Sequence, residues 1–320
     1  MKKILALACA LCLIFALAAP AALAADHYTV GICQLVQHPA LDAATQGFID
    51  ALNEELGEGT VNFYQQNASG DSATCAVIVN QFVSDEVNLI LANATPALLA
   101  AQAATNQIPI LGTSVTDYAS ALDIDAEDWT GATGTNISGT SDGVPAEEYA
   151  ALLNSLFPEA KNVGILYCSG EPNSKFQADE IRPILEEMGY KVTDYTFADS
   201  NDVSAVANNA CDDCDVLYIP TDNTAASNAE LINSVVMDKK IPVVAGEEGL
   251  CVGCGCVTLS ISYYDLGVVT GKMAAKILTG EADVSTMEIE YAPFEKKFNT
   301  VNCEALGLEI PEEFVAIETE

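Results

Sequence analysis

The chain has 320 residues, 50% of them hydrophobic, and a formal net charge of −34. This length and hydrophobic content suffice for one large or two medium-sized domains with a substantial core. The strong negative charge argues against nucleic acid phosphates and anionic lipid surfaces as partners.

The first residues have the pattern of a secretory signal peptide. Two lysines precede an apolar run over residues 4–19, and small residues follow, so we expect a leader over residues 1–25 that is cleaved after Ala24 or Ala25. The run is short for a membrane span, and no later stretch is long and apolar enough for one. We therefore expect export to the periplasm or the extracytoplasmic cell surface.

The segment over residues 30–52 sets the pattern for the rest of the chain. Residues 30–33 are apolar and predict a short buried strand, a polar loop follows, and apolar residues then recur at helical spacing from Leu41 to Leu52. In open α/β sheets, ligands bind beyond the carboxyl ends of the strands. Gln34 and His38, which lie in this loop, are therefore candidate ligand-binding residues.

The same succession of strand, polar loop and helix continues to residue 117. We predict strands at 60–66, 87–91 and 108–111, and helices at 73–83 and 97–105. The loops after the second and third of these strands contain Thr95 and Ser114. Residues 131–143 are rich in Gly, Ser and Thr, and we place the first crossing between two domains there.

The second half repeats the pattern. It predicts helices at 146–156, 176–188, 203–210, 225–237 and 263–278, and strands at 162–167, 191–197, 215–219, 241–244, 257–261 and 287–291, before a short tail. Polar residues again follow the strands, and the candidates for ligand binding among them are Ser169, Asn173, Ser174, Asp222, Asn223 and Glu247.

This repetition predicts an α/β protein with two similar doubly wound parallel-sheet domains. We expect three connecting segments between them. The predicted lobes are residues 26–140 plus 249–280 and residues 141–248 plus 281–320.

Eleven cysteines are present, and nine remain after Cys9 and Cys12 leave with the leader. The close spacings at residues 211–214 and 251–256 fit a disulfide or a metal site, or the thiols are packed as small hydrophobic groups. The two histidines of the mature chain do not adjoin these cysteines. We therefore expect no metal site and no cofactor.

Several short segments, in this order along the chain, carry a resemblance to a known family: Gln34 with residues 38–44, and residues 94–97, 139–142, 220–224, 246–249 and 263–267. The chain resembles ABC-transporter substrate-binding proteins with the type I periplasmic binding fold, and among them the tryptophan or aromatic amino-acid type. The cysteines at residues 251–256 depart from the family pattern.

The resemblance implies that the two lobes close on a small ligand, which the protein then delivers to a membrane permease, and we expect a monomer. If the ligand is an amino acid, Asp222 and Glu247 are candidates for its ammonium group. Candidates for its carboxylate are Thr95, Ser114, Asn173 and Ser174. Gln34 and His38 would close the mouth of the cleft or contact the ligand side chain.

Each assignment has a structural alternative. Asn173 and Ser174 are also suited to capping a helix, Asp222 and Asn223 to forming a turn, and Glu247 to pairing with a lysine.

Two other functions compete with transport. A ligand-sensing module for a receptor would use the same two lobes. An exported hydrolase would need a nucleophile with a base, but the chain has no Gly-x-Ser-x-Gly and no His-Glu-x-x-His. Cys33 lies near His38 but ends an apolar strand, where a thiol usually packs without reacting. We therefore expect no enzyme activity.

Overall fold

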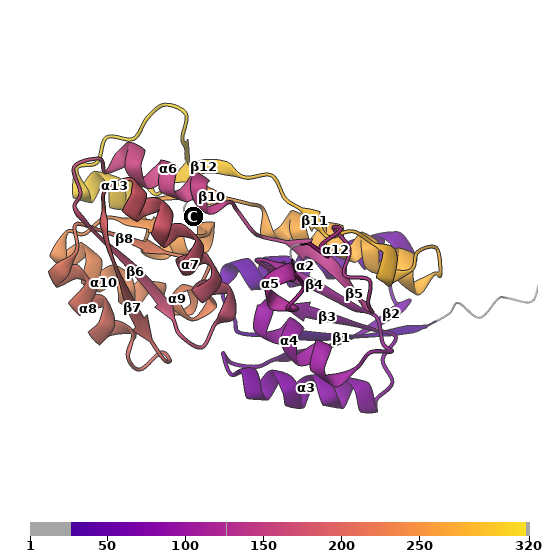
Figure 1. The fold of residues 1–320 in the computed structure, drawn as a ribbon. Coiled ribbons are helices and arrows are strands. Elements are labelled where there is room, and N and C mark those ends of the chain that lie inside the picture. Colours follow the sequence, from indigo (N-terminus) through magenta and orange to yellow (C-terminus); the bar gives the residue numbers. More distant parts are fainter. Residues whose placement is uncertain (1–26, 126, 318–320) are drawn as a thin grey trace, which may run out of the picture.

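The computed structural model describes residues 27–125 and 127–317, so the predicted leader lies outside the described residues. Within them, no helix combines the length and the apolar character that crossing a membrane requires. The chain forms two lobes side by side, and each consists of a sheet with helices on both faces (Figure 1).

The sheet of the first lobe has six strands in the order β11-β5-β4-β3-β1-β2, and every neighbouring pair is parallel. Its central strands are buried along most of their length because helices cover both faces. The strands are β1 (Tyr28–Gln34), β2 (Val61–Asn67), β3 (Leu89–Asn93), β4 (Ile110–Val115), β5 (Ile137–Ser141) and β11 (Glu290–Tyr291).

Two helices from distant parts of the chain, α2 (Pro39–Leu56) and α12 (Tyr263–Leu278), pack together on one face of this sheet. Their contact is close because of Gly47 and Gly267: a Cβ atom on Gly267 would lie 2.0 Å from the carbonyl oxygen of Ala44. The other face carries α3 (Ser72–Ser84), α4 (Thr95–Ala104) and α5 (Tyr118–Ala121), and a 3-10 turn, η1 (Val284–Thr286), precedes β11.

The sheet of the second lobe has seven strands in the order β13-β12-β10-β9-β8-β6-β7, and only the β10–β12 pair is antiparallel. The strands are β6 (Asn162–Cys168), β7 (Lys191–Phe197), β8 (Val216–Ile219), β9 (Val243–Ala245), β10 (Val257–Ser260), β12 (Glu295–Phe298) and β13 (Val315–Ala316).

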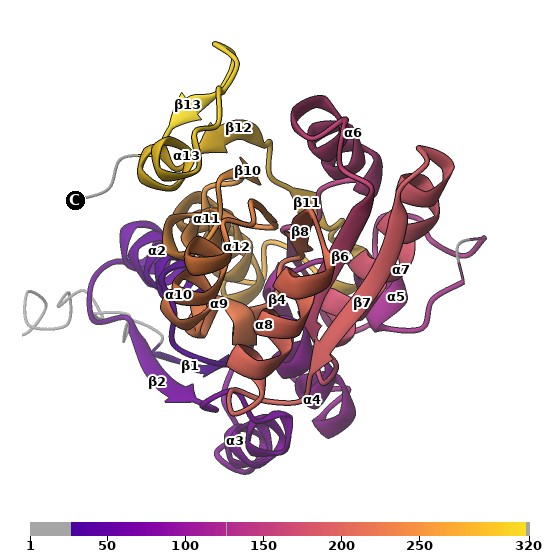
Figure 2. The ribbon, with the colours of Figure 1, turned by 90° about the vertical axis from the view of Figure 1, so that its left-hand side faces the viewer.

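Helices cover both faces of this second sheet as well (Figure 2). One face carries α6 (Ala146–Leu156), α7 (Pro172–Glu187) and α13 (Thr300–Leu306). The other carries α8 (Val203–Asp213), α9 (Asn223–Ser227), α10 (Ala229–Lys239) and α11 (Glu248–Gly253). The predicted fold class, two doubly wound parallel-sheet lobes, is confirmed.

Three segments connect the lobes, between β5 and α6, between β10 and α12, and between β11 and β12. The lobes therefore exchange after Ser141, Ser260 and Tyr291, which corrects the predicted crossings at residues 248 and 280. The sequence shows that β10 and β11 are strands but not which sheet they join, because that depends on pairing with distant strands: Val257 pairs with Val244, and Glu290 pairs with Thr140.

Most predicted elements are present within a few residues, and α6, β7 and α12 have the predicted bounds. β5 was not predicted, because it lies inside the Gly-, Ser- and Thr-rich segment, and β12, α13 and β13 fall in the predicted tail. The predicted strand at 287–291 is shorter, with only Glu290 and Tyr291 paired. These strands contain polar or small residues and so lack the apolar signal of a buried strand.

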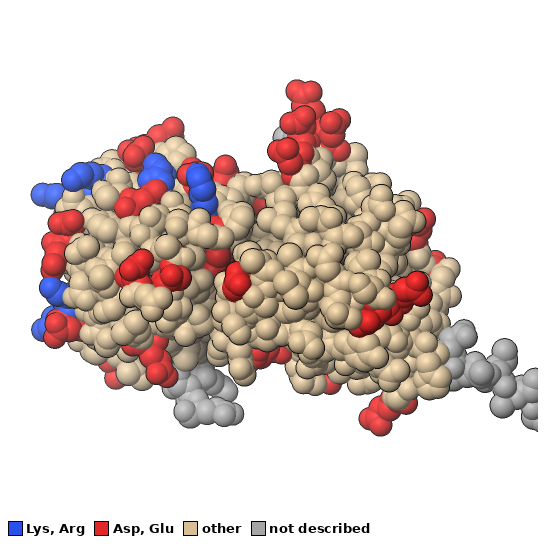
Figure 3. All heavy atoms as spheres, turned by 90° about the horizontal axis from the view of Figure 1, so that it is seen from below, with Lys and Arg blue, Asp and Glu red and all other residues tan. Residues whose placement is uncertain are grey.

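Positive charge is distributed unequally between the lobes. Residues 27–142 contain no Lys or Arg, so the first lobe has only Lys272 and Lys276, both on α12. On the face shown in Figure 3, blue side chains lie only on the second lobe. The first lobe therefore offers an anionic ligand very few basic side chains.

Candidate functional site

The carboxyl ends of the parallel strands in the two lobes flank the cleft between them. Loops that follow β3 and β4 in the first lobe and β6 in the second bring polar residues there, including Thr95, Ser114 and Asn173. This is the position at which open α/β sheets bind ligands.

Buried polar atoms without a hydrogen-bond partner gather around this cleft. They are Thr95 Oγ1, Ser114 Oγ, Thr116 Oγ1, Asp142 Oδ1 and Asn173 Oδ1, and each residue is at most 7% exposed. An unpaired buried polar atom costs about 1–3 kcal/mol, so a group of them in one place indicates a site for a polar ligand.

The backbone near these atoms is strained. Ala94 has φ +90° and Ser114 has φ +54°, conformations that residues with a Cβ rarely adopt. Ala94 N donates to Thr113 O (3.0 Å), so the two strained segments lie side by side. Strain of this kind costs roughly 1–3 kcal/mol per residue and is concentrated at binding sites.

Two helices begin beside the cleft. A small cavity of about 70 Å³ is lined by Thr95, the first residue of α4, and by Pro172 and Asn173, the first residues of α7. Free N–H groups and the helix dipole make a helix N-terminus attractive to anions. A carboxylate placed here would face one such terminus from each lobe.

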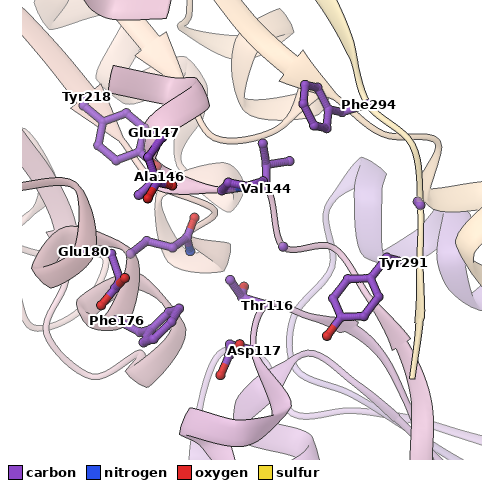
Figure 4. Close-up of a pocket in the computed structure, with 14 residues that line it drawn as sticks. Thr116, Asp117, Val144, Ala146, Glu147, Phe176, Glu180, Tyr218, Tyr291 and Phe294 are labelled. Atoms are coloured by element: carbon purple, nitrogen blue, oxygen red, sulfur yellow. The ribbon is translucent and has the colours of Figure 1, made fainter. Parts of the chain in front are cut away.

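A larger cavity of about 450 Å³ adjoins the small one, since Asp117 and Phe176 line both (Figure 4). Its volume lies in the range of small-molecule sites. Thr116 faces it from the first lobe, and two of the connecting segments border it. Its aromatic lining consists of Phe176, Tyr218, Tyr291 and Phe294. Among the described residues that line either cavity, none is Lys or Arg.

Asp142 is a buried carboxylate at the first crossing between the lobes, next to Gly143, which lines the larger cavity. It directly follows β5, is 4% exposed and accepts a hydrogen bond from the Tyr263 hydroxyl at Oδ2 (2.8 Å), which leaves Oδ1 free. Burial raises the pKa of Asp142, and the hydroxyls of Tyr263 and Thr116 lower it in part. Asp142 and Thr116 are not among the residues predicted from the sequence. The signal available for Asp142 was its place in a segment that carries the family resemblance.

The structure brings three predicted residues, Thr95, Ser114 and Asn173, to the cleft with an unpaired atom each. Ser174 lies next to Asn173, is fully buried and donates weakly to Thr221 O (3.4 Å). Ser169 is exposed and donates to Phe197 O (3.2 Å), away from these atoms.

Gln34, Asp222 and Glu247 are occupied by contacts within their own lobes. Gln34 donates to Asp42 (2.7 Å) and accepts from Thr45 (2.7 Å). Asp222 caps α9 at Ala225 N (2.7 Å) and accepts from Cys168 N (2.7 Å).

Glu247 caps α11 through Gly249 N (2.6 Å) and Leu250 N. Burial raises the pKa of Glu247 to about 7, and burial and Glu171 together raise that of Asp222 to about 8. Asp222 and Glu247 thus both cap helices, whereas the structural alternatives considered for them were a turn and a lysine partner.

His38 and Asn223 contact each other across the cleft, at 3.1 Å between Nε2 and Oδ1.

All nine cysteines of the described chain are buried free thiols. No group of three or more His, Cys, Asp or Glu side chains within residues 27–125 and 127–317 is arranged to hold a metal.

Two α/β lobes with three connecting segments and a polar cleft between them define a periplasmic-type binding protein. The model of the family "ABC transporter substrate binding protein" matches residues 29–320, so the chain belongs to that family. It is 36% identical over 255 residues to a tyrosine-binding protein from Clostridioides difficile, which covers 79% of this chain and 73% of the relative.

Solved structures agree with this assignment. An ABC domain from Streptococcus pneumonia in complex with L-Trp matches with a TM-score of 0.84 and 30% identity, over 89% of this chain and 96% of that one. A ligand-free, open substrate-binding protein with adhesive properties from Clostridium difficile matches with a TM-score of 0.66 and 37% identity, over 92% of this chain and 100% of that one.

The open relative is more similar to this chain in sequence but less similar in overall structure than the L-Trp complex.

Proposed function

We propose that this chain binds an aromatic amino acid between its lobes outside the cytoplasm and delivers it to the permease of an ABC importer. The observation that carries the proposal is the set of unpaired buried polar atoms from both lobes beside an aromatic-lined cavity. The relatives named for tyrosine and bound to L-Trp support the same ligand class.

The ligand's two charged groups fit different parts of the site. The ammonium group would donate to Asp142 Oδ1, which is buried and free. The carboxylate would lie at the N-termini of α4 and α7 and accept from the Thr95 and Ser114 hydroxyls. Because no basic side chain lines these cavities in the described structure, neutral donors and helix dipoles would hold the carboxylate.

The side chain of the ligand fits the larger cavity. Phe176 and Tyr218 line it, and aromatic pairs contribute roughly 0.5–1.5 kcal/mol beyond the burial of apolar area. Gln177 and Glu180 also line this cavity and could accept a hydrogen bond from a phenol or an indole N–H group.

A thermal-shift screen of the mature protein against amino acids, nucleosides and sugars tests the proposal. A ligand present at 100 times its dissociation constant stabilises the folded state by about 2.7 kcal/mol. We expect L-tyrosine or L-tryptophan to raise the melting temperature. The D-enantiomers are the controls, because they place the ammonium and carboxylate groups differently on the α-carbon. A shift with sugars or nucleosides and with no amino acid would refute the proposal.

The remaining expectations concern export and association. Family membership implies a permease partner, and we propose that the mature protein meets it as a monomer after removal of residues 1–25. Light scattering of the mature protein and mass spectrometry of the exported form measure these two properties. A stable dimer, or a retained leader, would contradict them.

A further inference from the structure

One hydrogen bond joins the lobes away from the three connecting segments. His38 Nε2 lies 3.1 Å from Asn223 Oδ1, and the two residues precede and begin helices of different lobes, α2 and α9. Both are 6% exposed. Within the described residues, no other hydrogen bond or ion pair crosses between the lobes outside those segments.

The direction of this hydrogen bond follows from a third residue. The Glu171 carboxylate accepts from the backbone N (3.0 Å) and Nδ2 (2.6 Å) of Asn223, and from the backbone N and hydroxyl of Thr224 (2.7 Å each). A carboxylate only accepts, so Nδ2 of Asn223 must face it and Oδ1 must face His38. His38 therefore carries its proton on Nε2 and donates.

We propose that His38, Asn223 and Glu171 form a latch that holds the lobes closed and slows the escape of the bound ligand. Glu171 orients the Asn223 amide within the second lobe, and His38 engages it only when the lobes meet. The latch itself concerns lobe closure, and its effect on ligand escape rests on the proposed function.

The latch should weaken in acid. Burial lowers the pKa of His38. The hydrogen bond to Asn223 and the charges of Glu171, in the second lobe, and Asp42, on α2, raise this pKa, but their effect is smaller. In the open form, His38 would be in water, where its ordinary pKa is about 6.5. Protonation therefore favours the open form, and dissociation should accelerate as the pH falls below about 6.5.

Stopped-flow dissociation of tyrosine or tryptophan tests the latch with His38→Ala, Asn223→Ala and the double variant. Loss of one hydrogen bond should raise the dissociation rate about 2- to 10-fold, with little change in the association rate. Because both single changes break the same contact, the double variant should dissociate no faster than Asn223→Ala, which also removes the Nδ2 hydrogen bond to Glu171. His38→Gln, which keeps a side-chain N–H donor, should restore slow dissociation but lose the acid dependence. His27→Ala is the matched control, because His27 is exposed.

A second measurement does not need a ligand. Spin labels on α3 and α8 report the distance between the lobes in the unliganded protein. We expect His38→Ala to shift the distances toward the open form. If no amino acid binds but the distances shift, the latch stands and the proposed function fails. If His38→Ala changes neither the distances nor the dissociation rate, there is no latch, whatever the ligand.

Discussion

The substitution Asp142→Asn should weaken ligand binding without lowering the stability of the unliganded protein. The change keeps the size of the side chain and an oxygen that can accept from Tyr263, but it removes the negative charge from Oδ1. A hydrogen bond to a charged group contributes roughly 1.5–3 kcal/mol. Since about 1.4 kcal/mol corresponds to a factor of ten in affinity, the dissociation constant for tyrosine or tryptophan should rise roughly 10- to 150-fold.

The same change should not destabilise the unliganded protein. Burial raises the pKa of Asp142 because its charged form is poorly solvated, and one of its oxygens has no partner. A neutral amide avoids the cost of this buried charge. We therefore expect a melting temperature equal to or above that of the wild type, as often occurs when a binding residue is replaced.

Isothermal titration calorimetry and thermal unfolding measure the two effects on one sample. Asp238→Asn is the matched control, since Asp238 is exposed on α10 and its replacement makes the same change in net charge. The reasoning would be refuted if Asp142→Asn bound both amino acids within twofold of the control. A loss of stability in parallel with binding would show that Asp142 has a structural role instead.

Three further predictions concern other parts of the molecule. Burial raises the pKa of Glu247 from 4.5 to about 7, so the folded protein retains a proton that the unfolded chain releases, and stability should fall as the pH rises through this window. Glu247→Gln should flatten that part of the curve of melting temperature against pH, and an unchanged slope would contradict it. Gly267→Ala should destabilise the fold by about 1–3 kcal/mol in urea unfolding, because its Cβ would meet the Ala44 carbonyl; an unchanged midpoint would show that α2 and α12 can separate freely. A thiol reagent should label none of the nine buried cysteines rapidly in the native protein and all nine in denaturant, and fast native labelling would argue against their packing.

The local sequence determined the βα pattern of both lobes. Apolar runs such as residues 30–33 have no helical period and are bounded by polar loops, so they predict buried strands; α12, by contrast, has apolar residues at helical spacing throughout. These signals are local, and so is the order in which polar loops follow the strands. This is why the sequence places Thr95, Ser114 and Asn173 just beyond the ends of strands.

Only the tertiary structure decided which polar side chains are free for a ligand. Asp222 and Asp142 both follow strands in the structure, although the sequence predicts only the strand before Asp222. In the structure, Asp222 accepts from the backbone N of Cys168, a residue 54 positions away, whereas one oxygen of Asp142 has no partner. The assignment of β10 and β11 to their sheets depends on equally distant pairings. Hydrogen bonds between residues far apart in the chain leave no periodic signal in the sequence, so the strands and their loops can be predicted from it but their final partners cannot.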